Sequence, residues 1–148
     1  MVLEKYKKKR NFRKTSEPKP KIKKTRGKPI YVIQEHHASH LHWDLRLEFD
    51  GVLKSWAVPK KPSKNPKDKR LAVQVEDHPI DYAKFEGVIP EGEYGAGKVK
   101  IWDKGTFELI SKKVNKIIFK INGKRLKGNY VLVKFKPPKN WLLFKKKE

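Results

Sequence analysis

Groups that can bind a metal ion and a phosphate are concentrated in one short stretch of the sequence. Four of the five histidines lie between His36 and His42, and Asp44 and Arg46 follow. In a β-strand, side chains two positions apart share a face and lie roughly 7 Å apart, so His42, Asp44 and Arg46 would point the same way. Imidazole and carboxylate groups bind Mn²⁺, Zn²⁺, Co²⁺ or Fe²⁺, and a guanidinium can hold a phosphate through two hydrogen bonds. The spacing predicts a divalent metal site with a phosphate-binding group beside it.

The phase of the alternation separates the histidines from one another. His40 shares a face with His42, whereas His37 is out of phase and is expected to be a bystander. His36 is in phase with His42 only if one strand runs unbroken through both. The alternative interpretation is a solvent-facing polar surface on which the histidines have no specific role. This alternative is the weaker one, because several imidazoles are clustered and Asp44 is in phase with them.

A second polar face is expected farther along the chain, at Glu76 and His78. These residues are in phase and can converge with the first strand across a sheet or inside a barrel. His78 would then donate a proton to a leaving oxygen or bind phosphate, and hydrogen bonding at a strand end explains it equally well. Tyr82 follows one helical turn later and could donate a hydrogen bond to an anion, although a lone tyrosine is more often part of a core.

The elements that position these groups are short strands. Apolar and polar residues alternate most clearly in three segments, 41–49, 71–75 and 117–121. Asp50-Gly51 and Asn122-Gly123 are strong hairpin signals, and a further turn is expected at 103–105. Only the segment 81–85 suggests a helical turn. The pattern predicts an all-β fold, a small closed or partly open β-barrel of about eight antiparallel strands with one or two short helical turns.

Two other segments are expected to have structural roles. The glycine-rich segment 87–97 matches neither the Walker phosphate loop nor the dinucleotide-binding fingerprint, so tight turns are the prediction. Residues 141–144 (WLLF) lie among lysines and could stack on bases, but their alternation favours a core strand.

Positive charge is distributed unevenly over a chain of 148 residues with a net charge of +22. Residues 1–28 carry +11, residues 29–95 carry −2, and residues 96–148 carry +13. Basic flanks of this strength favour a polyanion such as nucleic acid, because each neutralised phosphate releases counterions. A solvated lysine-rich surface is the alternative explanation, and it excludes neither binding nor catalysis.

Composition limits the remaining classes. The absence of cysteine excludes disulfides, thiolate catalysis and cysteine-ligated metals. No apolar run approaches the roughly 20 residues of a membrane span, and no signal-peptide core follows the basic start, which predicts a cytoplasmic protein without a membrane partner. The expected organisation is a basic, partly ordered N-terminal arm at 1–28, which can contribute to the site, and one β-barrel domain at 29–148.

Several long motifs resemble the 3′-phosphoesterase domain of bacterial and archaeal DNA ligase D. The central one is QEHHASHLHWDLRLE at 34–48. Further agreement lies in KSWAVPK at 54–60, VEDHP at 75–79, FEGVIPEGEYG at 85–95, LKGNYVLV at 126–133 and NWLL at 140–143. The resemblance covers nearly the whole chain, and without polymerase or ligase motifs it suggests a stand-alone member. It implies a β-barrel enzyme that uses a divalent metal, typically Mn²⁺, to remove a 3′-terminal ribonucleoside from DNA and then hydrolyse the 3′-phosphate to a 3′-OH.

The resemblance also implies roles for single residues. The metal ligands would be His36, His42 and Asp44, and the groups that engage the scissile phosphate would be Arg46, His78 and Tyr82. Lys60, Arg70 and Glu76 match supporting positions of the pocket, and Gln34 matches a nearby polar position. In the arm, Arg10, Phe12 and Glu17 fit a short motif whose Arg and Glu contribute to activity. Asn11 stands where the family typically has Asp, a departure that concerns the monoesterase step more than metal binding.

The partners implied are DNA 3′ ends and a ligase or polymerase of end joining, and the bacterial or archaeal nucleoid is the natural location. Two other functions remain open at this point. One is a catalytically silent nucleic-acid-binding barrel with a structural metal. The other is a metal-dependent enzyme acting on small phosphoesters, which would show little dependence on salt.

Overall fold

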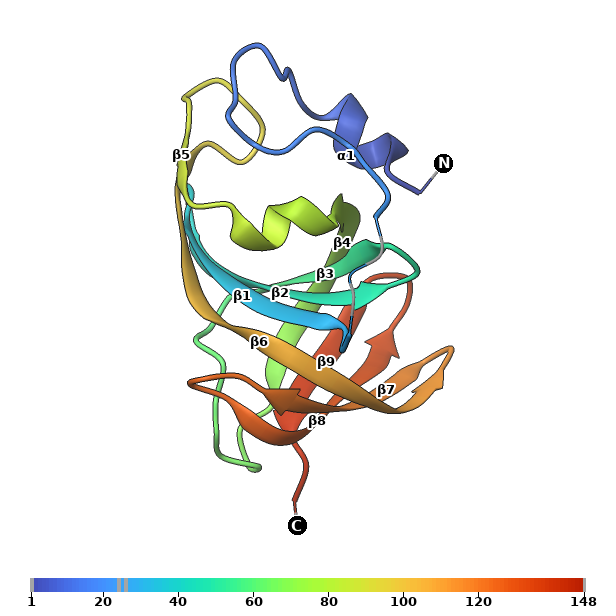
Figure 1. Cartoon of the computed structure of the whole chain (residues 1–148). Helices are drawn as coiled ribbons and strands as arrows, with labels where there is room; N and C mark the ends of the chain where they lie inside the picture. Colours follow the sequence, from blue (N-terminus) through green and yellow to red (C-terminus); the bar gives the residue numbers. More distant parts are fainter. Residues whose placement is uncertain (1, 24, 26, 148) are drawn as a thin grey trace.

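The structure is a computed structural model that describes residues 2–23, 25 and 27–147. It is built from nine antiparallel strands and two short helices (Figure 1). The strands are β1 (Ile30–His37), β2 (Leu41–Phe49), β3 (Val52–Val58), β4 (Arg70–Pro79), β5 (Gly87–Ile89), β6 (Gly97–Lys113), β7 (Lys116–Asn122), β8 (Lys127–Lys136) and β9 (Asn140–Lys145). The helices are α1 (Glu4–Lys8) and the 3₁₀ helix η1 (Ile80–Lys84). No helix among the described residues is long and apolar enough to cross a membrane.

Eight of the strands form a closed barrel. Their order is β1-β2-β3-β4-β9-β8-β7-β6, and pairing of β1 with β6 closes the circle, while β5 adds to β6. The barrel interior is apolar, with Tyr31, Leu45, Trp56 and Phe119 each at most 1% exposed. The predicted all-β barrel of about eight antiparallel strands with one or two helical turns is therefore confirmed.

The hairpin between β2 and β3 forms where its sequence signal lies. Asp50 and Gly51 both have positive φ, 52° and 81°, as a tight two-residue turn requires. The turn aligns Trp43 through Phe49 with Val58 through Val52. The turn therefore sets the pairing register of β3 with β2, the strand that carries His42 and Asp44.

The turn predicted at 103–105 is wrong, because β6 continues through it. Asp103 is 3% exposed and accepts hydrogen bonds from the Tyr31 hydroxyl at 3.0 Å and from backbone N–H groups of residues 124–126 at 2.8–3.0 Å. Gly105 allows close strand contact, since a Cβ there would lie 2.0 Å from the Asn122 carbonyl oxygen. An Asp and a Gly that suggest a turn in fact anchor the loop between β7 and β8.

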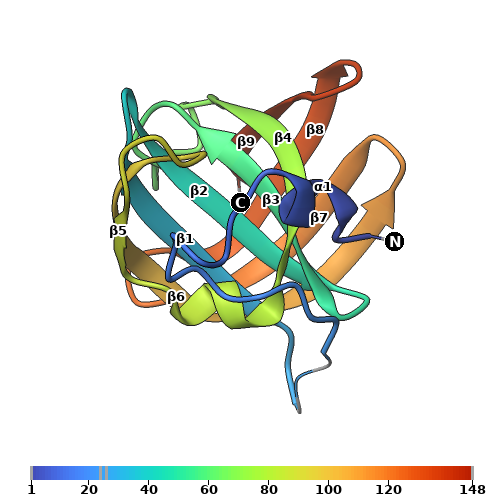
Figure 2. The ribbon, with the colours of Figure 1, turned by 90° about the horizontal axis from the view of Figure 1, so that it is seen from above.

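A second layer covers the outer face of the wall formed by β1, β2 and β3. Figures 1 and 2 show the N-terminal arm, with α1, and the helix η1 lying against this wall. Tyr6 of the arm, Leu53 of β3 and Tyr82 of η1 share one buried cluster outside the barrel. Helix α1 was not predicted, because lysines dominate that segment. Consequently the outward polar face of β2 is enclosed between the barrel wall and the layer formed by the N-terminal arm and η1.

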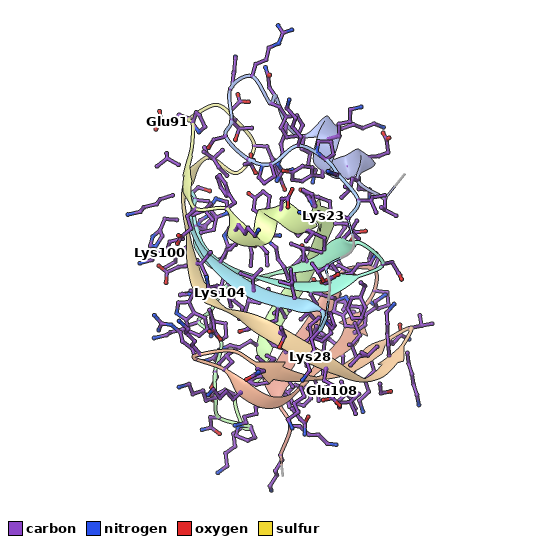
Figure 3. All side chains as sticks on the ribbon, viewed as in Figure 1. Lys23, Lys28, Glu91, Lys100, Lys104 and Glu108 are labelled. Carbon is purple, nitrogen blue, oxygen red and sulfur yellow. The ribbon has the colours of Figure 1, made fainter. Side chains whose placement is uncertain are left out.

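Most of the remaining charge lies on the outside of the barrel. Lys100, Lys104 and Glu108 are exposed side chains of β6, labelled in Figure 3. The buried ionic groups are instead concentrated under the arm and include Glu17, Asp44, Arg46, Glu76 and His78. The burial pattern therefore distinguishes a solvated basic surface from the enclosed polar site under the arm, and Asp103 is a buried carboxylate outside that site.

Candidate active site and metal centre

Three metal-ligating side chains converge on the outer face of β1 and β2. His36 and His42 are directly opposite each other in the β1–β2 ladder, and their ring centroids are 4.7 Å apart. Asp44 lies 3.5 Å from His36 Nδ1 and 3.2 Å from His42 Nε2. One ligand atom from each residue falls within 4.8 Å of the others. This donor set can hold one divalent ion.

The hydrogen bonds of the two imidazoles decide which nitrogen is free to bind a metal. His36 Nε2 donates to the Gly95 carbonyl oxygen at 2.6 Å, and His42 Nδ1 donates to the His40 carbonyl oxygen at 3.0 Å. The opposite nitrogen of each ring faces Asp44 and, when it carries no proton, offers a lone pair to a metal. Such backbone contacts fix ring tautomer and orientation in metal sites, so the residues present fit a divalent ion.

The charge state of the cluster also suits metal binding. Burial opposes ionisation of Asp44, but the Arg46 guanidinium and the two imidazoles outweigh it and hold the pKa of this carboxyl far below its usual range. Burial similarly opposes charge on His42, yet the hydrogen bond and charge of Asp44 raise the pKa of its ring. Asp44 is thus ionised at neutral pH, and a metal must compete with a proton for His42.

His36 joins the cluster by a route that the alternation did not reveal. The chain turns back at residues 38–40, so His36 meets His42 across a hairpin and not along one unbroken strand. His40 precedes β2 and is exposed, and only its carbonyl contributes. The side chain of His37 is 44% exposed and pairs with Glu35 at 2.6 Å, away from the cluster.

Arg46 places a buried cation beside the metal ligands. Its Nε donates to Gln34 Oε1 at 2.7 Å, and its Nη2 lies 3.5 Å from Asp44. The guanidinium lies 4.7 Å from the centre of the Tyr82 ring. Nη1 is buried and has no hydrogen-bond partner among the residues that the structure describes. A buried donor of this kind is suited to an anion, because leaving it unpaired is costly.

Gln34 contacts Arg46 and does not line the pocket. It is fully buried, and its amide nitrogen donates to the carbonyl oxygens of Tyr82 and Phe85 at 2.7 and 3.1 Å. These bonds orient its oxygen toward Arg46 Nε. The predicted substrate-binding group is therefore placed behind the cation.

A β-bulge brings one carboxylate and one imidazole of β4, those of Glu76 and His78, into the same site. The register between β3 and β4 shifts between Leu53 and Ser55, so that one residue of β3 opposes two of β4. As a result Val75, Glu76 and His78 all line one pocket, which strict alternation would not permit. The bulge is what directs Glu76 toward the arm.

His78 is held neutral in this setting. Burial, followed by the charges of Arg46 and Arg10, keeps the pKa of the ring well below its usual value. Its Nδ1 donates to the Glu76 carbonyl oxygen at 2.9 Å, which leaves Nε2 to accept from Arg10 Nη2 at 3.3 Å. His78 therefore presents a lone pair, not a proton, until an anion enters.

The arm supplies a buried ionic network over the pocket. Arg10 Nε donates to Glu17 at 2.9 Å, and Arg10 Nη1 donates to Glu76 at 3.3 Å. Glu17 also accepts from the Tyr82 hydroxyl at 2.6 Å and from Thr15 at 2.9 Å. Burial and the nearby Glu17 charge raise the pKa of Tyr82 well above its usual value, so its hydroxyl remains a donor. The predicted arm residues are thus brought to the site.

Replacing Glu17 by alanine is expected to loosen the arm and lower the free energy of unfolding by roughly 3–5 kcal/mol, since it removes one of the two carboxylates that pair with buried Arg10 and the acceptor of the Tyr82 hydroxyl. Urea unfolding measures the loss, and limited proteolysis detects earlier cleavage within residues 1–28. Glu91→Ala, at an exposed loop position, serves as the control. Equal stability of the two variants would show that the network does not hold the arm.

The depressed pKa of His78 predicts a stability that falls with acid. Below about pH 6.5 an unfolded histidine takes up a proton that folded His78 does not, so the unfolded state gains protons and the free energy of unfolding decreases. His42, whose pKa is raised, contributes with the opposite sign. His78→Asn should remove up to about 1.4 kcal/mol per pH unit from the slope between pH 6.5 and 5, measured by urea unfolding in EDTA. An unchanged slope in the variant would contradict this.

The pocket under the arm has a volume of about 260 Å³. Its lining is Arg10, His36, Ala38, His42, Asp44, Arg46, Ala57, Val75, Glu76, His78, Tyr82, Ile89, Tyr94 and Gly95. Tyr94 was missed by the sequence analysis, because the glycine-rich segment was assigned to turns alone. Its hydroxyl accepts from Lys9 at 3.4 Å, and Lys9 also binds Glu76 at 3.1 Å. No local signal in the sequence identifies Lys9 among so many lysines.

Lys60, Arg70 and Asn11, which the sequence analysis named, do not belong to the lining of this pocket. Lys60 is exposed after β3, and Arg70 begins β4, where its Nε donates to the Lys61 carbonyl oxygen at 2.9 Å. Arg70 is eight residues from His78, roughly 26 Å along a strand. Asn11 is exposed and its Oδ1 accepts from the Arg13 backbone N–H at 3.1 Å, a turn contact that an Asp would also make.

Comparisons with known proteins identify the family of the chain. The family model described as the DNA Ligase D 3′-phosphoesterase domain matches residues 34–134. The chain is 46% identical to the multifunctional non-homologous end joining protein LigD of Pseudomonas aeruginosa, with 99% of the chain and 19% of that protein covered. It is 46% identical to the LigD of Mycolicibacterium smegmatis (97% and 20%) and 47% identical to that of Mycobacterium tuberculosis (89% and 18%). The chain therefore spans about a fifth of the length of these relatives. With this match across the barrel and the metal triad, the chain belongs to the DNA ligase D 3′-phosphoesterase domain family.

Proposed function

We propose that this protein heals DNA 3′ ends by metal-dependent phosphoester hydrolysis. It removes a 3′-terminal ribonucleoside and hydrolyses the resulting 3′-phosphate to a 3′-OH. The observation that carries this proposal is the His36–His42–Asp44 cluster beside the buried Arg46, whose Nη1 has no partner among the described residues. The relatives that carry this domain are named as end-joining proteins, which supports a DNA substrate in end joining.

The site is suited to the charge that develops in phosphoryl transfer. When bound by the two imidazoles and Asp44, a divalent ion such as Mn²⁺, or Zn²⁺ or Co²⁺, supplies positive charge at a phosphate oxygen and lowers the pKa of a water. Arg46 donates its free N–H group to a second phosphate oxygen. Because this cation is buried and oriented by Gln34, it needs little reorganisation as negative charge grows.

The remaining groups hold the substrate and move a proton. A phosphate near His78 raises the pKa of the ring, so that Nε2 can bind the phosphate or donate a proton to the leaving oxygen. In this step Nε2 exchanges its contact with Arg10 for one with the substrate. Arg10, Tyr82 and Glu17 hold the side chains of the pocket in position. On the barrel side, Glu76 accepts a hydrogen bond from Arg10.

We further propose that residues 1–28 act as an arm of the active site and residues 29–148 as the phosphoesterase barrel. The basic flanks, +11 and +13, are suited to hold DNA backbone around the near-neutral centre. A DNA ligase or polymerase that needs a 3′-OH would consume the product. The cytoplasm, at the nucleoid, is the corresponding location.

The decisive experiment follows a 5′-labelled primer–template that ends in one 3′ ribonucleotide, with Mn²⁺, with other divalent ions and with EDTA. The expected result is a metal-dependent conversion to a 3′-phosphate end and then to a 3′-OH end. Binding without any conversion would overturn the proposal and favour a nucleic-acid-binding barrel with a structural metal. Hydrolysis of small phosphoesters alone, without salt dependence, would favour a metal-dependent enzyme that acts on small phosphoesters.

A further inference from the structure

One open end of the barrel holds a second cavity, separate from the pocket under the arm. The β2–β3, β6–β7 and β8–β9 hairpins surround this end (Figures 1 and 2). The cavity measures about 430 Å³, within the range of sites that hold small organic molecules. None of its lining residues belongs to the lining of the pocket under the arm.

The floor of this cavity is aromatic. Trp56 and Trp141 meet edge to face with centroids 5.9 Å apart, and the partly buried Phe49 lies at the rim of the same core. Trp141 Nε1 donates to Gln74 at 3.1 Å. The Nε1 of Trp56 is buried and has no hydrogen-bond partner among the residues that the structure describes. The floor is therefore formed by aromatic rings.

The walls of the cavity are cationic. Lys112 Nζ lies 4.9 Å from the centre of the Phe49 ring, and Lys134 Nζ lies 5.1 Å from the centre of a Trp141 ring. Lys54 pairs with Asp77 at 2.9 Å, and the lining also includes Lys113. No acidic residue belongs to the described lining. Lysines held over aromatic rings combine attraction for phosphate with a flat apolar surface.

We propose that this lysine-walled barrel end binds an unpaired nucleotide of single-stranded nucleic acid. The base would contact Phe49 and the tryptophan floor, and the flanking phosphates would contact Lys112 and Lys134. Duplex DNA does not fit this chemistry, because its bases are stacked in the helix and not free to reach an aromatic floor. The volume and the net positive lining together favour a nucleotide over an apolar ligand.

The position of the cavity relates it to the catalytic side of the barrel. Gln74 lines the barrel end, and His78, four residues farther along β4, lines the pocket under the arm. This separation is roughly 13 Å along a strand. The inference goes beyond the proposed function, because binding at the barrel end requires neither metal nor hydrolysis. A strand overhanging a processed end could occupy it while the 3′ end is in the pocket.

The test compares two charge-matched double variants in EDTA. Lys112→Gln with Lys134→Gln removes the cations of the barrel end, and Lys104→Gln with Lys127→Gln removes two exposed lysines outside it. Fluorescence anisotropy with a fluorescein-labelled oligo(dT) eight-mer measures Kd across salt concentrations. We expect the first double variant to bind about tenfold more weakly and to lose about 1.4 from the salt slope, since single strands contribute roughly 0.7 per phosphate contact. The control should change affinity less than about threefold.

A second variant separates stacking from charge. Phe49→Leu keeps an apolar side chain but removes a ring, and it should weaken oligo(dT) binding at least threefold with an unchanged salt slope. Equal loss in both double variants, or an equal effect of Lys112→Gln with Lys134→Gln on blunt duplex binding, would overturn the proposal. Displacement of the eight-mer by dTMP at equal concentration would overturn the assignment to a strand. All these readouts are binding constants in EDTA, so failure of the hydrolytic function leaves them unaffected.

Discussion

His42→Ala is expected to lower Mn²⁺-dependent hydrolysis of both the 3′-ribonucleotide end and the 3′-phosphate end by at least about 10³-fold. The variant removes one of three ligands from a cluster that has no other His, Asp or Glu within it among the described residues. It also removes the ring that pairs with Asp44 at 3.2 Å. Both reactions should fail together, because the proposed function uses the same ion for both. Product analysis on denaturing gels with a labelled primer measures the loss.

A matched control distinguishes loss of the ligand from loss of a histidine. His37→Ala removes an exposed imidazole in the same hairpin, whose contact is with Glu35, and it should retain near-normal rates. Calorimetric titration with Mn²⁺ should show binding to the His37 variant and none to the His42 variant. Retention of full activity by His42→Ala would exclude the cluster as the metal centre.

Arg46→Lys is expected to reduce kcat by about 10²–10³-fold with little change in Mn²⁺ affinity. Lysine keeps a positive charge but lacks the fork that lets Arg46 contact Gln34 and still present an Nη1 that no described residue binds. Preorganised donors of this kind act mainly in the transition state, so the loss should appear in kcat more than in KM. Steady-state kinetics on a 3′-phosphate primer measures both parameters.

Arg13→Lys is the control for this substitution, because Arg13 is an exposed arginine of the arm. It should change kcat by less than about twofold. A further comparison uses Gln34→Ala, which leaves Arg46 in place but removes the acceptor for its Nε. An intermediate loss in this variant would show that orientation of the guanidinium matters. Wild-type kcat in Arg46→Lys would mean that charge alone is sufficient.

Much of the barrel could be predicted because its signals are local. Alternation over 41–49 and the Asp50-Gly51 turn determine a hairpin without reference to the rest of the chain. The turn wrongly predicted at 103–105 shows the limit of this approach. Asp103 accepts hydrogen bonds from the backbone N–H groups of 124–126, which lie 21 to 23 residues farther along the chain. No residue next to Asp103 in the sequence indicates this interaction.

The β-barrel and the grouping of His42, Asp44 and Arg46 on one face could be predicted from the sequence, because strand periodicity is a property of adjacent residues. Pairing between strands is what brings His36 to His42 across a hairpin, and a bulge in that pairing turns Glu76 toward the site. Contacts between distant residues also hold the arm over the site, through a Glu17 carboxylate shared by Arg10 and by Tyr82, 65 residues away. These arrangements depend on pairing, burial and charge between distant segments, which periodicity along the chain does not record.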